Sequence, residues 1–288
     1  MLKGLPNAES RLFLFEADVY KPDSFGLAIE GCEIVFHMAT PLLHNNQSSQ
    51  YKNTSEAAVA AVKSIAESCI KSGTVKRLIY TASIVAASPL KHDGNGEYKD
   101  FMDETCWTPL NHSFAYPKDF LIDYAHSKTL SEKEVLKYNT ENLQVVSLAC
   151  GLVGGDAIQS NIPESVAVLI AQYLNDKNRY EVLRFLEELN GKLPILHLQD
   201  VTSAHIFSME NSEIKGRFLC ASAFLKSSEI ANFLEKFHQE TKIEDGFIED
   251  TKRDIKWGSS KLEEFGFEYK YGVEKILNDS VECIKRFL

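Results

Sequence analysis

The sequence predicts an α/β fold with a doubly wound parallel sheet. In the first half of the chain, short apolar runs alternate with longer stretches of helical spacing, as in repeated strand–helix units. Gly31 and Gly73 follow two of the expected helices, where a left-handed backbone commonly ends a helix. With 288 residues, 44% of them hydrophobic, the chain can fill one large domain or two smaller lobes.

The individual elements follow from periodicity and from turn residues. Residues 92–111 contain Asp93-Gly94-Asn95-Gly96 and have the composition of a surface loop. We expect strands over residues 12–15, 33–38, 77–83, 143–148, 193–198 and 216–221. We expect helices over residues 23–30, 51–72, 120–138, 166–173, 180–189 and 227–238. The first of these helices should partly bury Phe25, Leu27 and Ile29, and Ser227 should cap the last.

The alternation becomes irregular after Gly151, where Gly154-Gly155 and Pro163 interrupt the chain. We therefore divide the chain into residues 1–150, which form most of the sheet, and residues 151–288, which form mainly a smaller lobe. Within the second part, residues 193–210 are expected to return to the sheet. Phe185 and Leu189 could line a pocket in this lobe, but their positions suit a core equally well.

Charge and composition exclude several classes of protein. The net charge of -10, from 31 basic and 41 acidic residues, argues against a nucleic-acid partner. No run of about 18 uncharged apolar residues predicts a membrane span, and the first residues do not resemble a signal peptide. The six cysteines form no Cys-x-x-Cys pair and the eight histidines show no metal spacing. We expect a cytoplasmic monomer without a metal site.

The chemistry-bearing segment is Tyr124-Ala125-His126-Ser127-Lys128. A spacing of four places Tyr124 and Lys128 on one face of a helix. A neighbouring ammonium favours the phenolate of a tyrosine, so this pair could supply an acid with a lowered pKa. The spacing alone is weak, because Tyr173 and Lys177, and also Tyr271 and Lys275, have it.

Context separates Tyr124 from these two matches. It lies in a long expected helix that directly precedes a buried strand, whereas Ser83 closes an earlier strand. A hydroxyl at the carboxyl end of a parallel strand faces the crevice where such sheets bind ligands, so Ser83 could polarise a carbonyl. Two structural alternatives stay open. Ser83 could simply cap the next turn, and Tyr124 and Lys128 could form a surface pair.

Seven ordered stretches carry a resemblance that covers essentially the whole chain. The sequence resembles plant reductases of the dihydroflavonol reductase, anthocyanidin reductase and cinnamoyl-CoA reductase group, which are extended short-chain dehydrogenase/reductases. The matching stretches are residues 15–18, 35–41, 77–83, 103–107, 124–128, 197–201 and 259–262.

The resemblance implies a Rossmann-like NAD(P)-binding part in residues 1–150 and a substrate lobe in residues 151–288. It implies catalytic roles for Ser83, Tyr124 and Lys128 and makes NADPH the expected cofactor. The flavonoid-like carbonyl substrate would be a small molecule. The cofactor contacts that it implies are Asp18, Val19, Met38, Ala39, Thr40, Tyr124, Lys128, Ala149, Cys150, Gly151, Leu152 and Ser165.

The sequence also departs from the family. It has no Gly-x-x-Gly-x-x-Gly turn to hold the pyrophosphate, and alignment by motif makes residues 12–15 the third strand of the family's sheet. We interpret this as the result of an incomplete gene model or an alternative transcript, which lacks the first strands. Ala149 and Cys150 stand where the family often has proline and threonine. Ser88 stands where dihydroflavonol reducers commonly have asparagine, so a dihydroflavonol is not the first choice of substrate.

Three functional hypotheses remain open. The leading one is a carbonyl reductase of anthocyanidin reductase or dihydroflavonol reductase type. The second is a nucleotide-sugar epimerase or dehydratase, which uses the same three residue types with NAD. The third is a truncated, non-catalytic fragment that cannot bind cofactor.

Overall fold

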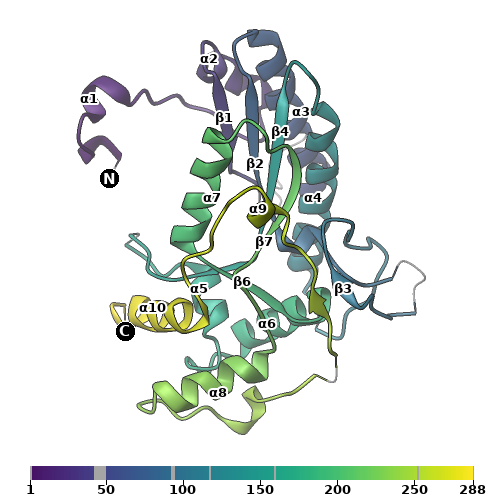
Figure 1. The fold of residues 1–288 in the computed structure, drawn as a ribbon, viewed down its shortest axis with the longest axis vertical. Coiled ribbons are helices and arrows are strands. Elements are labelled where there is room, and N and C mark those ends of the chain that lie inside the picture. Colours follow the sequence, from purple (N-terminus) through teal and green to yellow (C-terminus); the bar gives the residue numbers. More distant parts are fainter. Residues whose placement is uncertain are drawn as a thin grey trace.

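The computed structural model describes residues 2–41, 50–91, 95–116, 118–158, 160–251 and 253–287. Its main sheet is parallel and has the strand order β1-β2-β4-β7 (Figure 1). These strands are β1 (Ile34–His37), β2 (Arg77–Ser83), β4 (Gln144–Cys150) and β7 (Gly216–Cys220). Four strands expected from the sequence are thereby confirmed, and their order places β2 and β4 at the centre.

Helices cover both faces of the main sheet. Figure 1 shows α3 (Thr54–Ser72) and α4 (Asp119–Val135) on one side of the strands and α7 (Leu198–Glu210) on the other. The Asn53 side chain caps α3 by accepting a hydrogen bond from the Glu56 amide, and Gly73 ends it with a φ of 67°. The 3₁₀ turns beside these elements are η3 (Ile84–Ala86) and η4 (Leu136–Tyr138).

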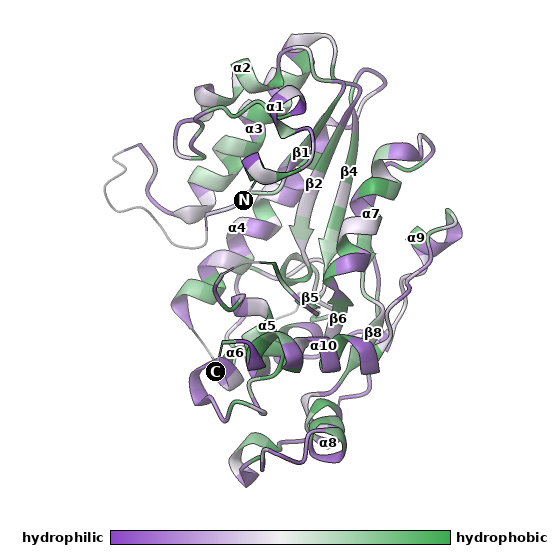
Figure 2. Cartoon of the chain, turned by 90° about the vertical axis from the view of Figure 1, so that its left-hand side faces the viewer, coloured by the Kyte–Doolittle hydropathy of each residue, from purple (hydrophilic) through white to green (hydrophobic). Residues whose placement is uncertain are grey.

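The central strands are apolar because both of their faces are covered. Leu78, Ile79, Val145, Val146 and Leu148 are all fully buried. In a parallel sheet between two helical layers, such continuous apolar runs replace the alternating pattern of a half-exposed strand. Figure 2 shows the main strands largely in green and white, the colours of apolar and intermediate residues.

The second lobe has its own three-stranded sheet, in the order β5-β6-β8. The expected strand at residues 193–198 exists, but it pairs with β5 and β8 rather than with the main sheet, so its predicted return to that sheet is wrong. Only the following helix, α7, returns to the main sheet. The strands are β5 (Leu152–Gly154), β6 (Leu193–His197) and β8 (Ala223–Leu225). The two-domain division itself stays a prediction.

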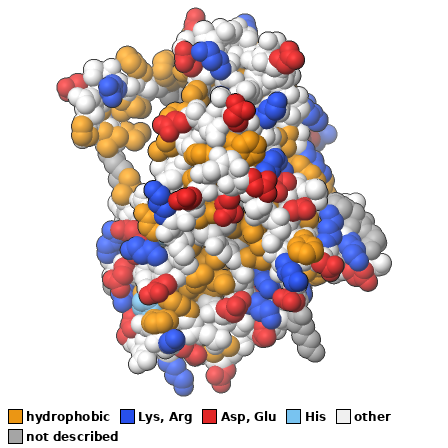
Figure 3. Space-filling view, in the orientation of Figure 1, with side chains coloured by type: hydrophobic (Ala, Val, Ile, Leu, Met, Phe, Trp, Pro, Cys, Tyr) orange, Lys and Arg blue, Asp and Glu red, His pale blue; other side chains and the backbone are white. Residues whose placement is uncertain are grey.

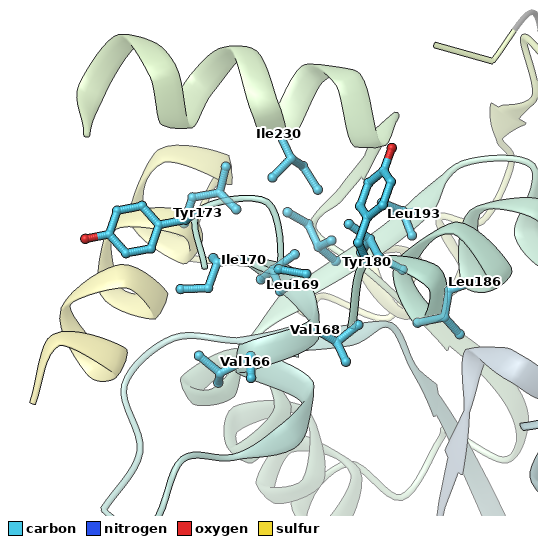
Figure 4. Close-up of a cluster of buried hydrophobic side chains, with 14 of the residues drawn as sticks. Val166, Val168, Leu169, Ile170, Tyr173, Tyr180, Leu186, Leu193 and Ile230 are labelled. Atoms are coloured by element: carbon cyan, nitrogen blue, oxygen red, sulfur yellow. The ribbon is translucent and has the colours of Figure 1, made fainter. Parts of the chain in front are cut away.

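Helices of this lobe close around a second hydrophobic core, which Figure 4 shows from within. Leu169, Ile170 and Ile230 are fully buried there. Together with Leu193 of the small sheet, they join two helices to one strand. The helices are α5 (Glu164–Leu169), α6 (Lys177–Asn190), α8 (Ser227–Phe237) and α10 (Val273–Lys285).

The amino-terminal residues differ most from expectation. Residues 12–15 form no strand, and no described strand pairs with them. Phe13, Leu14 and Phe15 are instead 75%, 58% and 55% exposed, and Figure 3 shows hydrophobic side chains gathered on this arm at the upper left. A strand needs a neighbour for its backbone hydrogen bonds, and none of the described strands lies beside this segment. The arm also contains η1 (Leu2–Gly4) and α1 (Ala8–Arg11).

Smaller corrections concern local chemistry. The helix expected over residues 23–30 is divided into η2 (Pro22–Phe25) and α2 (Gly26–Ile29), and Leu27 is 75% exposed rather than partly buried. Ser227 is the first residue of α8 rather than its cap, because its hydroxyl donates to Glu187.

The predicted surface loop at residues 92–111 is partly buried. Residues 92–94 lie outside the described residues. Met102 and Cys106 are fully buried, and β3 (Phe101–Met102) pairs with β9 (Lys256–Trp257). The remaining short elements are η5 (Asp245–Phe247) and α9 (Lys261–Glu264).

Candidate functional site

Ser83, Tyr124 and Lys128 lie around one cavity of about 430 Å³. Ser83 is the last residue of β2, whereas Tyr124 and Lys128 are one turn apart on α4. The Ser83 hydroxyl accepts a hydrogen bond from the Val85 amide at 3.4 Å and also hydrogen-bonds Tyr124. The capping interpretation of Ser83 is therefore confirmed, and its contact with Tyr124 keeps the catalytic interpretation as a prediction.

Lys128 is held inside the protein, with 4% of its surface exposed. Its Nζ atom donates to Thr40 Oγ1 at 3.0 Å and to the Thr81 carbonyl oxygen at 2.9 Å. The same Nζ atom lies 5.2 Å from the centre of the Tyr80 ring. The alternative of a surface pair is therefore wrong.

Burial disfavours the charged forms of both Lys128 and Tyr124, an ammonium and a phenolate. Burial lowers the pKa of Lys128 to about 8, against the opposing influence of Cys150 and Glu132. Burial also raises the pKa of Tyr124, whereas its hydrogen bond to Ser83 lowers it. The expected lowering of the tyrosine pKa by the neighbouring lysine is thus wrong for this structure, because loss of solvation dominates. Tyr124 is a neutral phenol at physiological pH.

A buried histidine supports the turn behind Lys128. His37, at the end of β1, is 4% exposed, and its Nε2 atom lies 2.8 Å from the Ala39 carbonyl oxygen. Burial lowers its pKa to about 4, so the ring is neutral and can donate this hydrogen bond. The contact fixes the residues that lead to Thr40, which in turn holds Lys128.

Most of the expected site residues meet at the cavity. Gly151 has a structural reason to be glycine, because a Cβ atom there would lie 2.6 Å from the Pro194 carbonyl oxygen. The predicted residues that line the cavity are Met38, Ser83, Tyr124, Lys128, Cys150, Gly151, Leu152 and Ser165.

Five predicted cofactor residues do not line this cavity. Val19 and Ala39 lie at a second cavity of about 450 Å³, beside β1, which Met38 also lines. Asp18 is exposed and bonds within its own turn, where its carboxylate accepts from the Tyr20 amide at 2.9 Å. Ala149 is fully buried in β4, and Thr40 contributes through the hydrogen bond that it accepts from Lys128.

Sequence reasoning missed most of the cavity wall. Val182 and Leu186 of α6 line it, whereas the suggested Phe185 and Leu189 are fully buried in the core. Both pairs have the same helical spacing, and only the orientation of α6 against η3 and α5 decides between them. The wall residues not predicted are Thr81, Ala82, Ile84, Val85, Phe120, Leu121, Val153, Glu164, Val168, Val182, Leu186 and Val201.

The two competing tyrosine–lysine pairs lie elsewhere. Tyr173 belongs to the core of the second lobe, and Tyr271 stacks on His197 at 4.2 Å between ring centres. Lys275 pairs with Asp279 on the surface. Ser88 is also outside the site, since it is 1% exposed and its hydroxyl donates to the Leu189 carbonyl.

Within the described ranges, no group of three or more histidine, cysteine or acidic residues could hold a metal ion. The six cysteines are free thiols. Among the helices of that same part of the chain, none combines the length and apolar character needed to cross a bilayer.

Known proteins with similar sequences include plant reductases. The chain is 32% identical to a putative anthocyanidin reductase from Ginkgo biloba, over 99% of this chain and 82% of that protein. It is 33% identical to vestitone reductase from Medicago sativa, over 99% of this chain and 84% of that protein. The resemblance inferred from the seven sequence stretches is thereby confirmed.

Solved structures agree with the parallel-sheet fold. The crystal structure of vestitone reductase from alfalfa matches with a TM-score of 0.77 and 31% identity, over 99% of this chain and 86% of that one. Yeast methylglyoxal/isovaleraldehyde reductase Gre2, solved in complex with NADPH, matches with a TM-score of 0.73 and 18% identity, over 97% of this chain and 86% of that one. The predicted fold class is confirmed.

Residues 6–209 match the 3-beta hydroxysteroid dehydrogenase/isomerase family, a span that includes β2, α4 and β4 with all three candidate catalytic residues. The chain therefore belongs to the 3-beta hydroxysteroid dehydrogenase/isomerase family of oxidoreductases, and plant anthocyanidin and vestitone reductases are among its relatives.

Proposed function

We propose that this chain is an NADPH-dependent reductase of a small, uncharged carbonyl compound of flavonoid-like type. One observation carries the proposal: Ser83, Tyr124 and a buried Lys128 line the same cavity. A hydroxyl, a neutral phenol and a cation at one point are the groups needed to orient a carbonyl and protonate its oxygen.

The residues around Lys128 fit the nicotinamide and ribose half of NADPH. Lys128 would bind ribose hydroxyl groups, and Gly151, which lines the same cavity, would lie beside the nicotinamide ring. When bound, NADPH would supply a hydride to the carbonyl carbon. Val19 and Ala39 would face the adenine at the second cavity. No glycine-rich turn from a strand into a helix occurs in the part of the chain that the structure describes, so the fit rests on this half alone.

The side chains divide the remaining chemistry. Ser83 would donate a hydrogen bond to the carbonyl oxygen and hold it beside Tyr124. The phenolic proton of Tyr124 would pass to that oxygen as the carbon is reduced, which converts the carbonyl to an alcohol. The raised pKa of Tyr124 keeps the proton on the acid before reaction, and the Lys128 ammonium would stabilise the phenolate formed afterwards.

The walls of the cavity favour an apolar substrate. Phe120, Leu121, Val182 and Leu186 contribute aliphatic and aromatic surface. Among the described wall residues, Glu164 is the only charged one besides Lys128, and Arg179 donates to each of its carboxylate oxygens at 3.1 Å. Such a wall offers little to the diphosphate of a nucleotide sugar, which weighs against the epimerase alternative. The names of the plant relatives support a flavonoid-like carbonyl compound.

The test is to titrate the purified chain with NADPH, following nucleotide fluorescence and the thermal midpoint together. Reduction of a panel of flavonoid carbonyl compounds is then measured. We expect Tyr124→Phe to bind NADPH with unchanged affinity but to reduce substrate at least about 100-fold more slowly.

Tyr271→Phe is the matched control, because Tyr271 has the same spacing to a lysine but lies outside the cavity. It should retain the wild-type rate. Absence of NADPH binding by the wild-type chain would contradict the proposal and favour the non-catalytic fragment.

A further inference from the structure

A fully buried carboxylate lies one turn after Lys128 on α4. Glu132 is 0% exposed, and three hydrogen bonds reach its two oxygens. Ser147 of β4 donates to Oε1 at 2.7 Å, and Arg217 of β7 donates from Nε at 3.1 Å and from Nη2 at 3.2 Å. The helix that carries Tyr124 and Lys128 is therefore fixed to two strands of the main sheet.

The partner guanidinium uses every donor that it has. Arg217 is 5% exposed, and its remaining N–H groups donate to the carbonyl oxygens of Glu104 at 2.9 Å, Cys106 at 2.5 Å and Ala86 at 3.2 Å. Its central carbon also lies 3.6 Å from the centre of the Trp107 ring. Five donors thus meet five acceptors, which is the full capacity of an arginine.

These contacts connect the two segments that carry the candidate catalytic groups. Ala86 belongs to η3, the turn that begins directly after Ser83. Glu132 lies one helical turn from Lys128. One planar, rigid guanidinium therefore fixes the distance between the end of β2 and α4. It also gives a role to the stretch from Asp103 to Trp107, which matches the family but does not reach the cavity.

We propose that the Glu132–Arg217 pair is a positioning device that holds Lys128 and Ser83 in their reactive arrangement. The inference rests on the proposed reductase function. Stability alone explains the pair poorly, because burying two opposite charges costs about as much desolvation energy as their attraction returns. Glu132 does not line the cavity, and among the described residues no hydrogen bond joins it to Lys128. It therefore acts on Lys128 through the helix that carries both residues and through its negative charge.

The charge of Glu132 reaches Lys128 as well. Glu132 and Cys150 both favour the charged lysine, against the burial that disfavours it. The described titratable groups around the Lys128 ammonium, other than Glu132, include no carboxylate. They are Tyr124 on α4, Tyr80 on β2, His37 on β1 and Cys150 on β4.

The experiment measures the titration of Lys128 directly, by the ¹³Cε shifts of labelled lysine in the full chain, with Lys128→Met for assignment. In wild type the pKa should lie near 8. In Glu132→Gln, which keeps the shape and removes the charge, it should fall. The basic limb of kcat against pH should move in the same direction, and kcat should drop about 10-fold or more with little change in KM.

Glu187→Gln is the matched control. Glu187 is also 0% exposed and pairs with a buried arginine, Arg184, at 2.6 Å, but it lies outside the cavity. It should lower stability as Glu132→Gln does and leave the Lys128 titration unchanged. A folded Glu132→Gln chain with unaltered Lys128 pKa and kcat would overturn the inference.

Ser147→Ala provides a second variant if Glu132→Gln does not fold. It removes one hydrogen bond from the carboxylate and keeps the charge, so kcat should fall and the Lys128 pKa should stay. An unchanged kcat would count against positioning. The lysine titration needs no activity, so a wild-type chain that neither binds nor oxidises NADPH defeats the proposed function, whereas the response of Lys128 to Glu132→Gln still decides the charge coupling.

Discussion

The central strands of the main sheet and residues 2–27 differ in how they use apolar side chains. In β2 and β4, Leu78, Ile79, Val146 and Leu148 are completely buried beneath the candidate site. In the amino-terminal region, Phe13, Leu14 and Leu27 are more than half exposed. The region that carries the candidate chemistry is thus closely packed, whereas the region expected to approach the adenine is not. Function and stability should therefore respond to substitutions near Lys128 and hardly to those on the arm.

The largest expected effect is on catalysis. Lys128→Met should lower the rate of carbonyl reduction by about 10²–10³-fold, because it removes the cation beside the developing phenolate. Steady-state kinetics with NADPH measures the loss. Lys275→Met is the control, since Lys275 also follows a tyrosine by four residues but pairs with Asp279 on the surface. Equal rates in the two variants would contradict the assignment of Lys128.

The packing of β4 should account for a large share of stability. Leu148→Ala should lower the free energy of unfolding by about 2–5 kcal/mol, because it leaves a cavity between buried layers. Denaturant unfolding followed by circular dichroism measures the change. A loss below about 1 kcal/mol would mean that the centre of the sheet is less tightly packed than this structure indicates.

Alkaline pH should stabilise the fold through Lys128. Its pKa is about 8 in the folded chain and about 10.4 when unfolded, so between these values the unfolded chain binds more protons. Stability should therefore rise from about pH 8 to pH 10.4, by on the order of 3 kcal/mol, and this contribution disappears as pH falls through 8. The difference between wild type and Lys128→Met isolates it from other groups. A parallel pH dependence in both chains would refute the prediction.

The smallest effect should come from the arm. Leu14→Ala should change the free energy of unfolding by no more than about 0.5 kcal/mol, because its side chain is 58% exposed. The same unfolding assay used for Leu148→Ala provides the comparison. A loss as large as that of Leu148→Ala would show that residues 12–15 pack against something in solution that they do not contact here.

Local sequence patterns correctly predicted those elements whose spacing and end are both encoded within the segment itself. The 51–72 helix was found because apolar spacing and Gly73 define it locally. The strand predicted over residues 12–15 does not form, because a strand depends on neighbouring strands that no local pattern specifies. The predicted capping role of Ser227 was wrong for a related reason, because its hydroxyl donates a hydrogen bond to Glu187, which is distant in the sequence.

The candidate site also combines features that one segment encodes with features that depend on how several segments pack. The pairing of Tyr124 with Lys128 follows from one helix and could be predicted, and so could the placement of Ser83 at a strand end. The apolar walls come from several helices and strands whose relative orientation the sequence does not state, so Val182 was missed in favour of Phe185. The pKa of Tyr124 was predicted in the wrong direction, because the extent of its burial could not be judged from spacing.

The anchoring of Lys128 has a consequence for any ligand that it meets. An ammonium has three N–H groups, and two of them are already engaged by Thr40 and Thr81. Rotation about the Cε–Nζ bond is therefore stopped, and tetrahedral geometry sets the direction of the third N–H group in advance. Among the described residues no further acceptor takes this group. A ligand hydroxyl would meet a preorganised donor and lose less entropy on binding than it would with a freely turning lysine.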